Sequence, residues 1–344
     1  MHENLNWKLP DNRQVIRTVD MHTAGEPLRI ITDGLPGIRG ATILEKRKFF
    51  RDNYDHIRKG IMWEPRGHAD MYGAVVTEPV NEGSDFGIFF LHNEGYSTMC
   101  GHAMIAIVKI VLETGMIKKD DNDPELNIDA PPGLIIARAV MKDGIVKVSS
   151  FRNVPSFVLY KDQTINVPGI GEVKFDVAYG GAFYAFCDAA QLGLNLNVSG
   201  ADRLIDYGRK IKLAVSENFE IKHPFEDDLG FLYGTIFTGN ACERGNHSRN
   251  VCIFADGELD RSPTGSGVSA RAAIHYSRSE LEKDETITIE SILGTTMDVR
   301  VTDNVKYGPY DAVVPEVTAT SYFTGKHEFY FDPDDPLREG FLIR

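Results

Sequence analysis

Short apolar runs separated by glycine turns dominate the chain, and their length is typical of strands. Three stretches favour helices instead: residues 101–115, a segment that starts near Ser266, and the polar residues 199–218. The first is apolar on nearly every side, so we expect it to be buried and wrapped by strands. Its end at Gly115 suits a glycine just beyond a helix. The pattern predicts an α+β fold with strands in GAVVTEP, FGIFFL, GLIIARAV, GIVKVSS, FYAFCD, YGTIFTG, VCIFA, ETITIES, TMDVRV and DAVVPEVTATSYFTG.

The pattern also repeats along the chain, which indicates a duplicated architecture. The segment GIFFLHNEGYSTMCGHAMIAIV, from Gly87, matches NVCIFADGELDRSPTGSGVSARAAI, from Asn250, at a constant offset. In this alignment Cys100 corresponds to Thr264. Each copy reads as an apolar strand, a polar loop, a turn of small residues and a helix.

Two further pairs follow the same order. IDAPPGLIIARAV, from Ile128, matches IESILGTTMDVRV, from Ile289, and TAGEPLRIIT resembles YGGAFYAFCD more loosely. We therefore expect two pseudo-symmetric halves, each with strands wrapped around a central helix. The first half would be residues 1–158 with Cys100, and the second residues 159–327 with Asp260 and Thr264. Residues 328–344 have no counterpart in this scheme, and we expect them to pack back on the first half.

Composition limits the partners of the protein. The chain of 344 residues carries a formal net charge of −13, which disfavours a broad surface for nucleic acid or acidic membranes. No apolar run is long enough to span a bilayer, and the N-terminal MHENLNWKLPDNRQ lacks an apolar signal core. The four cysteines are irregularly spaced, which favours a reducing compartment. We expect a cytoplasmic protein.

Matched helix starts suggest a chemical site. Two such starts can face each other across one cleft, where the backbone N–H groups of Gly101, His102, Gly265 and Ser266 can bind a carboxylate. A cysteine at a helix start is expected to have a lowered pKa, so that the Cys100 thiolate can act as a base.

Competing interpretations of the same residues are weaker. Cys187 and Cys252 lie within apolar strands, where a thiol is usually a small buried hydrophobe. Cys242, His247 and Cys252 match no common zinc spacing, so we expect no metal. The GSGVSA segment at Gly265 has the residue types of a dinucleotide-binding fingerprint. That fingerprint needs a tight turn after its strand, whereas an eight-residue polar loop separates this segment from its strand.

Several of these segments resemble the proline racemase family. DMHTAGEP (20–27) is similar to its N-terminal signature and MCGHA (99–103) to its first catalytic cysteine motif. YGGAFYA (179–185), DRSPTGSG (260–267) and DPDDPLREGF match further family blocks, so the resemblance covers most of the chain. It implies a diaminopimelate epimerase-like fold, a proline-type imino acid as substrate, no cofactor and a homodimer.

The resemblance also implies roles for individual residues. In the family, two cysteines flank the substrate Cα, one removing a proton and the other returning one to the opposite face. The first role carries over to Cys100, whereas the second position holds Thr264, whose hydroxyl is far too weak an acid. The implied substrate contacts are Gly101, His102, Asp260, Gly265 and Ser266, with His102 and Asp260 at the ring nitrogen.

Family members with Cys followed by Thr resemble the trans-3-hydroxy-L-proline dehydratases. In the trans substrate the C3 hydroxyl shares a face with the Cα proton, so one group can take the proton and protonate the departing hydroxyl. We therefore expect dehydration by Cys100 to Δ1-pyrroline-2-carboxylate through the Δ2 enamine, with Thr264 contacting substrate or filling space. The alternatives are an epimerase or racemase of proline or 4-hydroxyproline, a binding protein without turnover, and covalent thiol catalysis.

Overall fold

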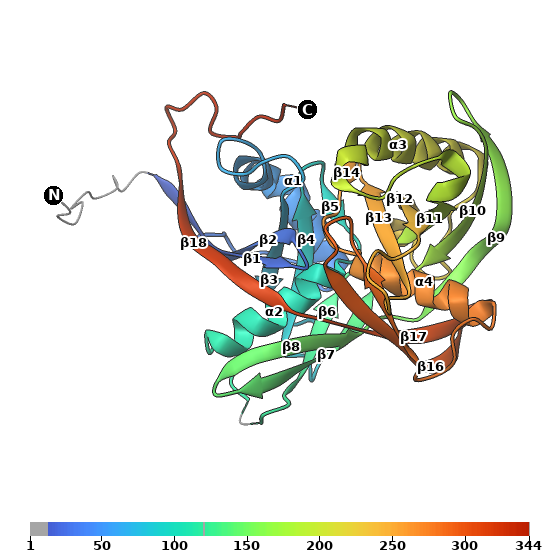
Figure 1. Cartoon of the computed structure of the whole chain (residues 1–344). Coiled ribbons are helices and arrows are strands. Elements are labelled where there is room, and N and C mark those ends of the chain that lie inside the picture. The colour runs from blue at the N-terminus through green and yellow to red at the C-terminus, as the bar shows by residue number, and fades with distance from the viewer. Residues whose placement is uncertain (1–12, 120, 344) are drawn as a thin grey trace.

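A computed structural model describes residues 13–119 and 121–343 of the protein. The N-terminal segment without a signal core therefore lies largely outside the described residues. Figure 1 shows two groups of elements side by side, each with a helix near its centre, α2 in one and α4 in the other. All the described strands belong to one mixed hydrogen-bonded sheet network that continues from one group into the other.

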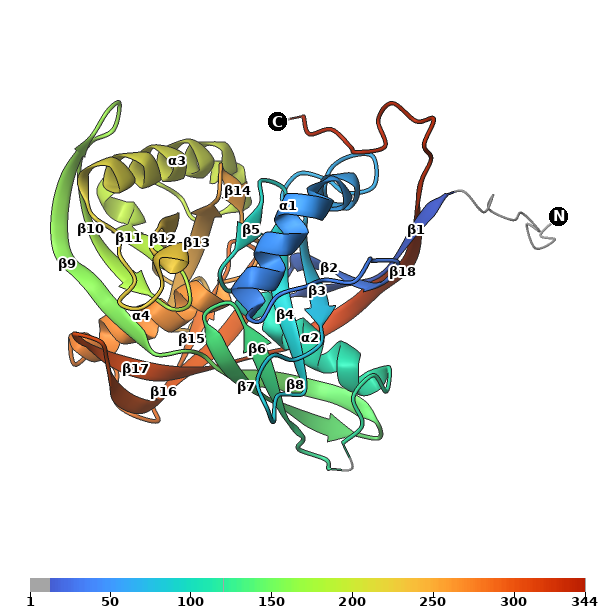
Figure 2. The same ribbon diagram turned by 180° about the vertical axis from the view of Figure 1, so that it is seen from behind.

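The first group contains two helices, α1 (Ile43–Met62) and α2 (Gly101–Glu113). Its strands are β1 (Gln14–Thr23), β2 (Glu26–Asp33), β3 (Tyr72–Thr77), β4 (Phe86–His92), β5 (Tyr96–Ser97), β6 (Glu125–Ala130), β7 (Gly133–Lys142) and β8 (Ile145–Arg152). Figure 2 shows α1 on the outside of this group, across β4. The expected helices did not include α1, because its charged residues interrupt the apolar pattern.

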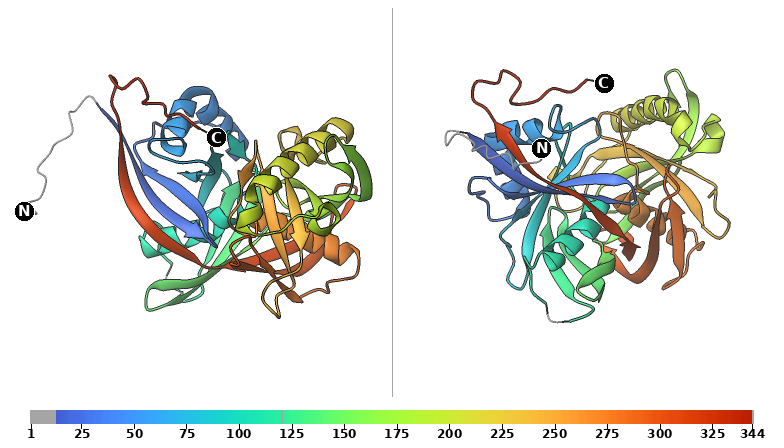
Figure 3. Two further views of the ribbon diagram at one scale, coloured as in Figure 1. Left: turned by 45° about the horizontal axis from the view of Figure 1, so that its top comes forward. Right: turned by 60° about the vertical axis from the view of Figure 1, so that its left-hand side comes forward.

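The second group also contains two α-helices, α3 (Ala201–Asn218) and α4 (Gly265–Ser277), and three short 3-10 turns. Its strands are β9 (Ser156–Val167), β10 (Gly171–Tyr179), β11 (Phe183–Asp188), β12 (Leu232–Gly239), β13 (Ser248–Phe254), β14 (Glu258–Leu259), β15 (Thr286–Glu290), β16 (Thr296–Tyr307) and β17 (Tyr310–Ala319). The last strand, β18 (Ser321–Phe331), leaves this group and runs along β1, as both views of Figure 3 show.

Strand pairings occur in the same order in both groups. β2 pairs with β3 in parallel and β3 with β4 antiparallel, and β11, β12 and β13 pair in the same two ways. In each group, the last long strand before the central helix pairs in parallel with the first strand after it, β4 with β6 and β13 with β15. α2 and α4 begin at the residues that the sequence alignment pairs, Gly101 and Gly265.

The two central helices are buried, as expected for α2. Residues 101–111 of α2 and 265–274 of α4 are buried, and one apolar core runs continuously around both helices. Gly115 follows the helix cap with φ +71°, which confirms the predicted glycine terminator of α2.

One strand expected from the sequence differs from the structure. The segment 311–325, expected as one strand, is two strands broken at Thr320, because the chain leaves the second group there to pair with β1. The boundary between residues 158 and 159 falls inside β9. No described helix is long and apolar enough to cross a membrane.

Candidate active site

The starts of α2 and α4 touch each other. A Cβ atom built on Gly101 would lie 2.5 Å from the Cα of Gly265, and one built on Gly265 would lie 2.7 Å from the Cα of Gly101. Only glycine permits this approach of two backbones. Since the first N–H groups of a helix have no partner within it, the contact brings two sets of backbone donors to one place.

A cavity at this contact is lined by all seven residues that the sequence predicted for the site. These are Cys100, Gly101, His102, Asp260, Thr264, Gly265 and Ser266. The open space is about 20 Å³, room for about one water molecule. The cavity is therefore nearly filled by its own walls, and a ring-sized ligand requires these walls to move apart.

The Cys100 thiol lies at the mouth of α2, beside His102. Its Sγ is 3.2 Å from Nδ1 of His102, and the residue is only 4% exposed. Burial raises the pKa of the Cys100 thiol well above its usual range, helped by the negative charge of Asp260, although the Ala103 N–H lowers it. The expected lowering of this pKa is therefore wrong for the buried site. The cost of removing the thiolate from water outweighs the stabilisation that the start of α2 gives to its negative charge.

His102 is held as a neutral imidazole. Burial lowers its pKa to about 4, against the opposing effect of the Asp260 carboxylate. The backbone carbonyl of His102 accepts a hydrogen bond from the hydroxyl of Thr23 at 2.9 Å. The neutral His102 ring, 3.2 Å from the thiol, can donate a hydrogen bond to the sulfur or accept one from it. The neutral ring adds no charge to the cavity.

Thr264 faces the cavity from the start of α4 and is bonded to Asp260. Its hydroxyl donates to Oδ2 of Asp260 at 2.8 Å, while the N–H of Ser262 donates to Oδ1 at 2.7 Å. Thr264 has φ +70°, an unusual conformation for a β-branched residue. These bonds orient the carboxylate of Asp260 toward the helix mouths.

Aromatic walls complete the cavity, and the sequence did not single them out. Tyr72, Tyr184, Tyr233, Phe254 and Met99 line it, and all are nearly fully buried. The hydroxyl groups of Tyr184 and Ser266 are 2.7 Å apart. Tyr184 and Met99 lie within segments already noted as motifs, but apolar strand residues carry no signal that separates a cavity wall from a core position.

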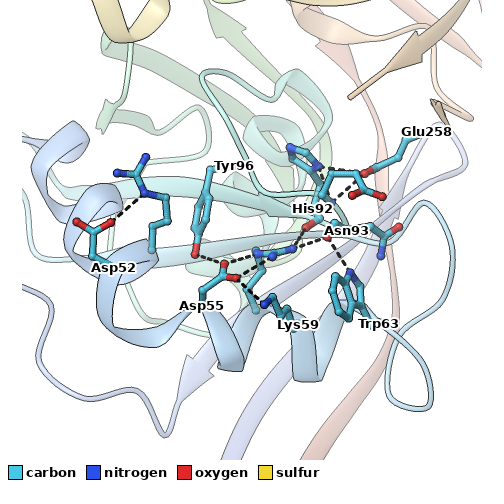
Figure 4. A network of polar contacts seen from close by, with 11 residues as sticks. Asp52, Asp55, Lys59, Trp63, His92, Asn93, Tyr96 and Glu258 are labelled. Atoms are coloured by element: carbon cyan, nitrogen blue, oxygen red, sulfur yellow. Dashed lines mark hydrogen bonds and ion pairs between the residues drawn. The ribbon is translucent and has the colours of Figure 1, made fainter. Parts of the chain in front are cut away.

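A buried contact between a histidine and a glutamate joins the two groups of elements beside these walls. Nδ1 of His92, at the end of β4, lies 3.0 Å from Oε1 of Glu258 in β14 (Figure 4). The His92 ring stacks on Tyr72 at 5.9 Å between ring centroids. Arg58 of α1 donates to the carbonyl of His92 at 2.9 Å, so α1 helps to fix this side of the cavity.

The sequence also raised Cys242, His247 and Cys252 as candidate zinc ligands. Cys242 is exposed whereas Cys252 is buried, and all four cysteines are free thiols. Within residues 13–119 and 121–343, no group of three histidine, cysteine or acidic side chains is placed to hold a metal ion.

Comparisons with known proteins give one consistent result. The proline racemase family profile matches residues 18–342. A protein of Colwellia psychrerythraea named trans-3-hydroxy-L-proline dehydratase is 52% identical, covering 96% of this chain and 93% of its own. A Bacillus cereus protein of the same name is 43% identical over 96% of this chain and 98% of its own.

Among solved structures, a hydroxyproline epimerase from Agrobacterium vitis with bound trans-4-hydroxy-L-proline superposes with a TM-score of 0.90. It is 26% identical, and the alignment covers 96% of each chain. Sequence and structure thus agree along nearly the whole length, and this chain belongs to the proline racemase family.

Proposed function

We propose that this protein is a lyase that dehydrates trans-3-hydroxy-L-proline. The observation that carries the proposal is the unequal pair of helix starts: a thiol, Cys100, at one and a threonine, Thr264, at the other. Relatives that are 43–52% identical over nearly the whole chain bear the name of that dehydratase. A protein with one thiol at this site lacks the second acid that inversion at Cα requires.

The duplicated architecture is part of the proposal. We infer two pseudo-symmetric halves with a diaminopimelate epimerase-like fold, divided near residues 158 and 159. The matched strand pairings around α2 and α4 support this division. The pairing of β18 with β1 supports the return of the C-terminal segment to the first half.

Substrate binding follows from the donors around the cavity. The backbone N–H groups of Gly101, His102, Gly265 and Ser266 hold the carboxylate, as converging helix starts favour an anion. Asp260 and His102 contact the ring nitrogen, where a carboxylate and a neutral imidazole can accept hydrogen bonds from a secondary ammonium group. Donors aimed at the carboxylate also stabilise the charge that develops when the Cα proton leaves.

Cys100 performs the proton transfers. Its thiolate takes the Cα proton, the C3–O bond breaks, and the new thiol protonates the departing hydroxyl to give water. The product is the Δ2 enamine, which tautomerises to Δ1-pyrroline-2-carboxylate. Burial disfavours the thiolate, whereas the positive ring nitrogen of a bound substrate favours it.

Thr264 has an indirect role in this scheme. Its hydroxyl already donates to Asp260, so it orients the carboxylate that contacts the substrate nitrogen. A hydroxyl exchanges protons with a carbanion far more slowly than a thiol does, which suppresses protonation from the opposite face.

The test is product formation by the purified protein. With trans-3-hydroxy-L-proline we expect a cyclic imine, detected as its coloured o-aminobenzaldehyde adduct, and no imine from proline or 4-hydroxyproline. Cys100→Ser should lower the rate by about 1,000-fold or more, because a hydroxyl is a much weaker base catalyst at neutral pH. Inversion of 4-hydroxyproline without imine from the 3-hydroxy substrate would contradict the proposal in favour of an epimerase.

Location and assembly are further proposals. The four free thiols support a reducing, cytoplasmic location. A homodimer is expected from the family, and light scattering of the purified chain measures its mass directly.

A further inference from the structure

The turn between β1 and β2, residues 23–26, contacts both halves of the site. The Thr23 hydroxyl donates to the carbonyl of His102, in the first turn of α2. On the other side, the hydroxyl of Thr295 donates to the carbonyl of Ala24 at 2.6 Å. Oε2 of Glu26 accepts a hydrogen bond from the N–H of Arg261 at 2.6 Å. The turn therefore connects the start of α2 with the loop that precedes α4, and we call it the bridging turn.

Glu26 is the unusual member of the bridging turn. Its side chain is completely buried, yet it forms no side-chain ion pair with the nearby Arg261 guanidinium, which is directed to Asp70 at 2.8 Å. Oε2 has a backbone donor, while Oε1 is buried without a hydrogen-bond partner among the residues that the structure describes. A buried carboxyl group with an unsatisfied oxygen is costly for stability, so its presence calls for a functional reason.

The hydrogen bond that Glu26 accepts holds the backbone next to an active-site residue, Asp260. The N–H that it accepts belongs to the peptide linking Asp260 to Arg261. Fixing that peptide fixes the backbone from which the Asp260 side chain projects. The Asp260 carboxylate accepts hydrogen bonds from the Ser262 N–H and the Thr264 hydroxyl, both from residues that follow it. The Asp260 N–H donates to the carbonyl of Cys252 in β13 at 3.0 Å. Glu26 thus holds this part of the backbone in place from the first group of elements.

We propose that Glu26 is a positioning residue that sets the Asp260 carboxylate against the substrate nitrogen, by accepting the Arg261 N–H across the two halves. This inference rests on the proposed role of Asp260 in binding substrate. No substrate contact by Glu26 itself is involved, since Glu26 does not line the cavity. The role requires an acceptor oxygen within hydrogen-bond distance of the Arg261 N–H.

A neutral side chain can serve this purpose. Burial raises the pKa of the Glu26 carboxyl well above its usual range, and the charges of Asp260 and Asp70 raise it further, against the lowering effect of Arg261. Glutamine keeps an acceptor oxygen at the same distance without a charge. Aspartate keeps the acid but is one methylene shorter, so it cannot hold the present 2.6 Å bond without movement of the backbone.

Glu26→Gln and Glu26→Asp therefore distinguish the effect of side-chain length from the effect of the acidic group. We expect Glu26→Gln to keep kcat/KM within about threefold of the parent, while Glu26→Asp and Glu26→Ala lower it about tenfold to hundredfold, mainly through a higher KM. Retained kcat/KM in a folded Glu26→Asp variant would overturn the proposal. A Glu26→Gln variant as impaired as Glu26→Ala would overturn it too, because acidity would then be the required property.

Asp70→Asn is the matched control. It removes the ion pair to the Arg261 side chain but leaves the Arg261 N–H and Glu26 in place. Asparagine also tolerates the φ of +64° at this position. We expect kcat/KM within about threefold of the parent. A loss equal to that of Glu26→Asp would show that the loop is merely fragile and would count against a specific role for Glu26.

A binding measurement keeps this test independent of the proposed reaction. Pyrrole-2-carboxylate, a planar ring with the same carboxylate, can be titrated calorimetrically into the parent and into each variant. We expect affinity to follow the order parent, Gln, then Asp and Ala, with unchanged circular dichroism. If the affinities follow this order but the parent forms no imine from trans-3-hydroxy-L-proline, the proposed function fails while the positioning role stands. Equal affinity in all variants would overturn the positioning role.

Discussion

At the scale of single residues, Thr264 marks the difference between one proton-transfer group and two. Its hydroxyl is committed to Asp260 at 2.8 Å, and its backbone is strained at φ +70°. Thr264→Cys replaces the hydroxyl with an ionisable thiol across the cavity from Cys100. We expect this variant to acquire Cα inversion, measured as deuterium uptake with change of configuration in proline. Dehydration should fall about tenfold, because Asp260 loses a hydrogen-bond donor of about 1.4 kcal/mol.

Thr264→Ser is the control for that substitution, because it keeps the hydroxyl and loses only the γ-methyl group. It should dehydrate at close to the parental rate and give no deuterium exchange in proline. Exchange by the serine variant, or none by the cysteine variant, would contradict the view that residue 264 faces the substrate from the side opposite Cys100.

Among single residues, the repeat pointed to positions that lie close together in the structure. The alignment of two helix starts brought out Cys100 and Thr264, and the structure places both, with the other five predicted residues, around one cavity. It gave no hint of Glu26, whose partner is a backbone N–H more than two hundred positions away. The direction of the Cys100 pKa shift was wrong because burial depends on the packing of both halves, which no local motif encodes.

At the scale of elements, the contact between α2 and α4 depends on the absence of side chains. Gly265→Ala places a methyl group 2.7 Å from the Cα of Gly101, where backbone rather than a flexible side chain must move. We expect the helix starts to separate, destabilising the fold by about 1–3 kcal/mol. The displaced N–H groups should lower kcat/KM about a hundredfold. Steady-state kinetics and thermal unfolding measure both effects.

Gly95→Ala is the matched control for Gly265→Ala. No atom lies within 4 Å of a Cβ built on Gly95, and its φ is not in the left-handed region. Its kinetics and unfolding should match those of the parent. Full activity in Gly265→Ala would show that the two helix starts do not need this approach.

Element prediction from sequence was good for strands and uneven for helices. The buried strands β3, β4, β12 and β13 are dense apolar runs, so their positions were evident. α1 was missed because only one stripe of its surface is buried, against β4, and charged residues fill the rest. The break at Thr320 was not evident from the sequence because no glycine or proline marks it, and only tertiary pairing turns the chain toward β1.

At the scale of the whole molecule, the C-terminal strand β18 leaves the second group of elements and pairs with β1 in the first group. β18 pairs with β1 from Gln14↔Phe331 to Thr23↔Ser321, and so it supports the strand that leads into the bridging turn. Phe331 packs in a separate apolar cluster with Ile16, Phe50 and Ile57 beneath α1. Beyond Phe331 the contacts are fewer, among them the ion pair between Arg13 and Asp332 and the hydrogen bond from Phe341 N–H to Glu64.

Two truncations distinguish the strand from the segment after it. Removal of residues 332–344 should leave a folded, active enzyme whose melting temperature falls by only a few degrees. The segment is held mainly by partly exposed ion pairs and by a few hydrogen bonds, to Arg13, Glu64 and Arg66. Removal of residues 320–344 should expose the edge of β1 and the cluster around Phe331, giving insoluble protein without activity. Soluble yield, circular dichroism and imine formation measure the difference. A soluble, active protein ending at Ala319 would contradict the structural role of β18, because β1 and its bridging turn would then hold their positions unpaired on that side.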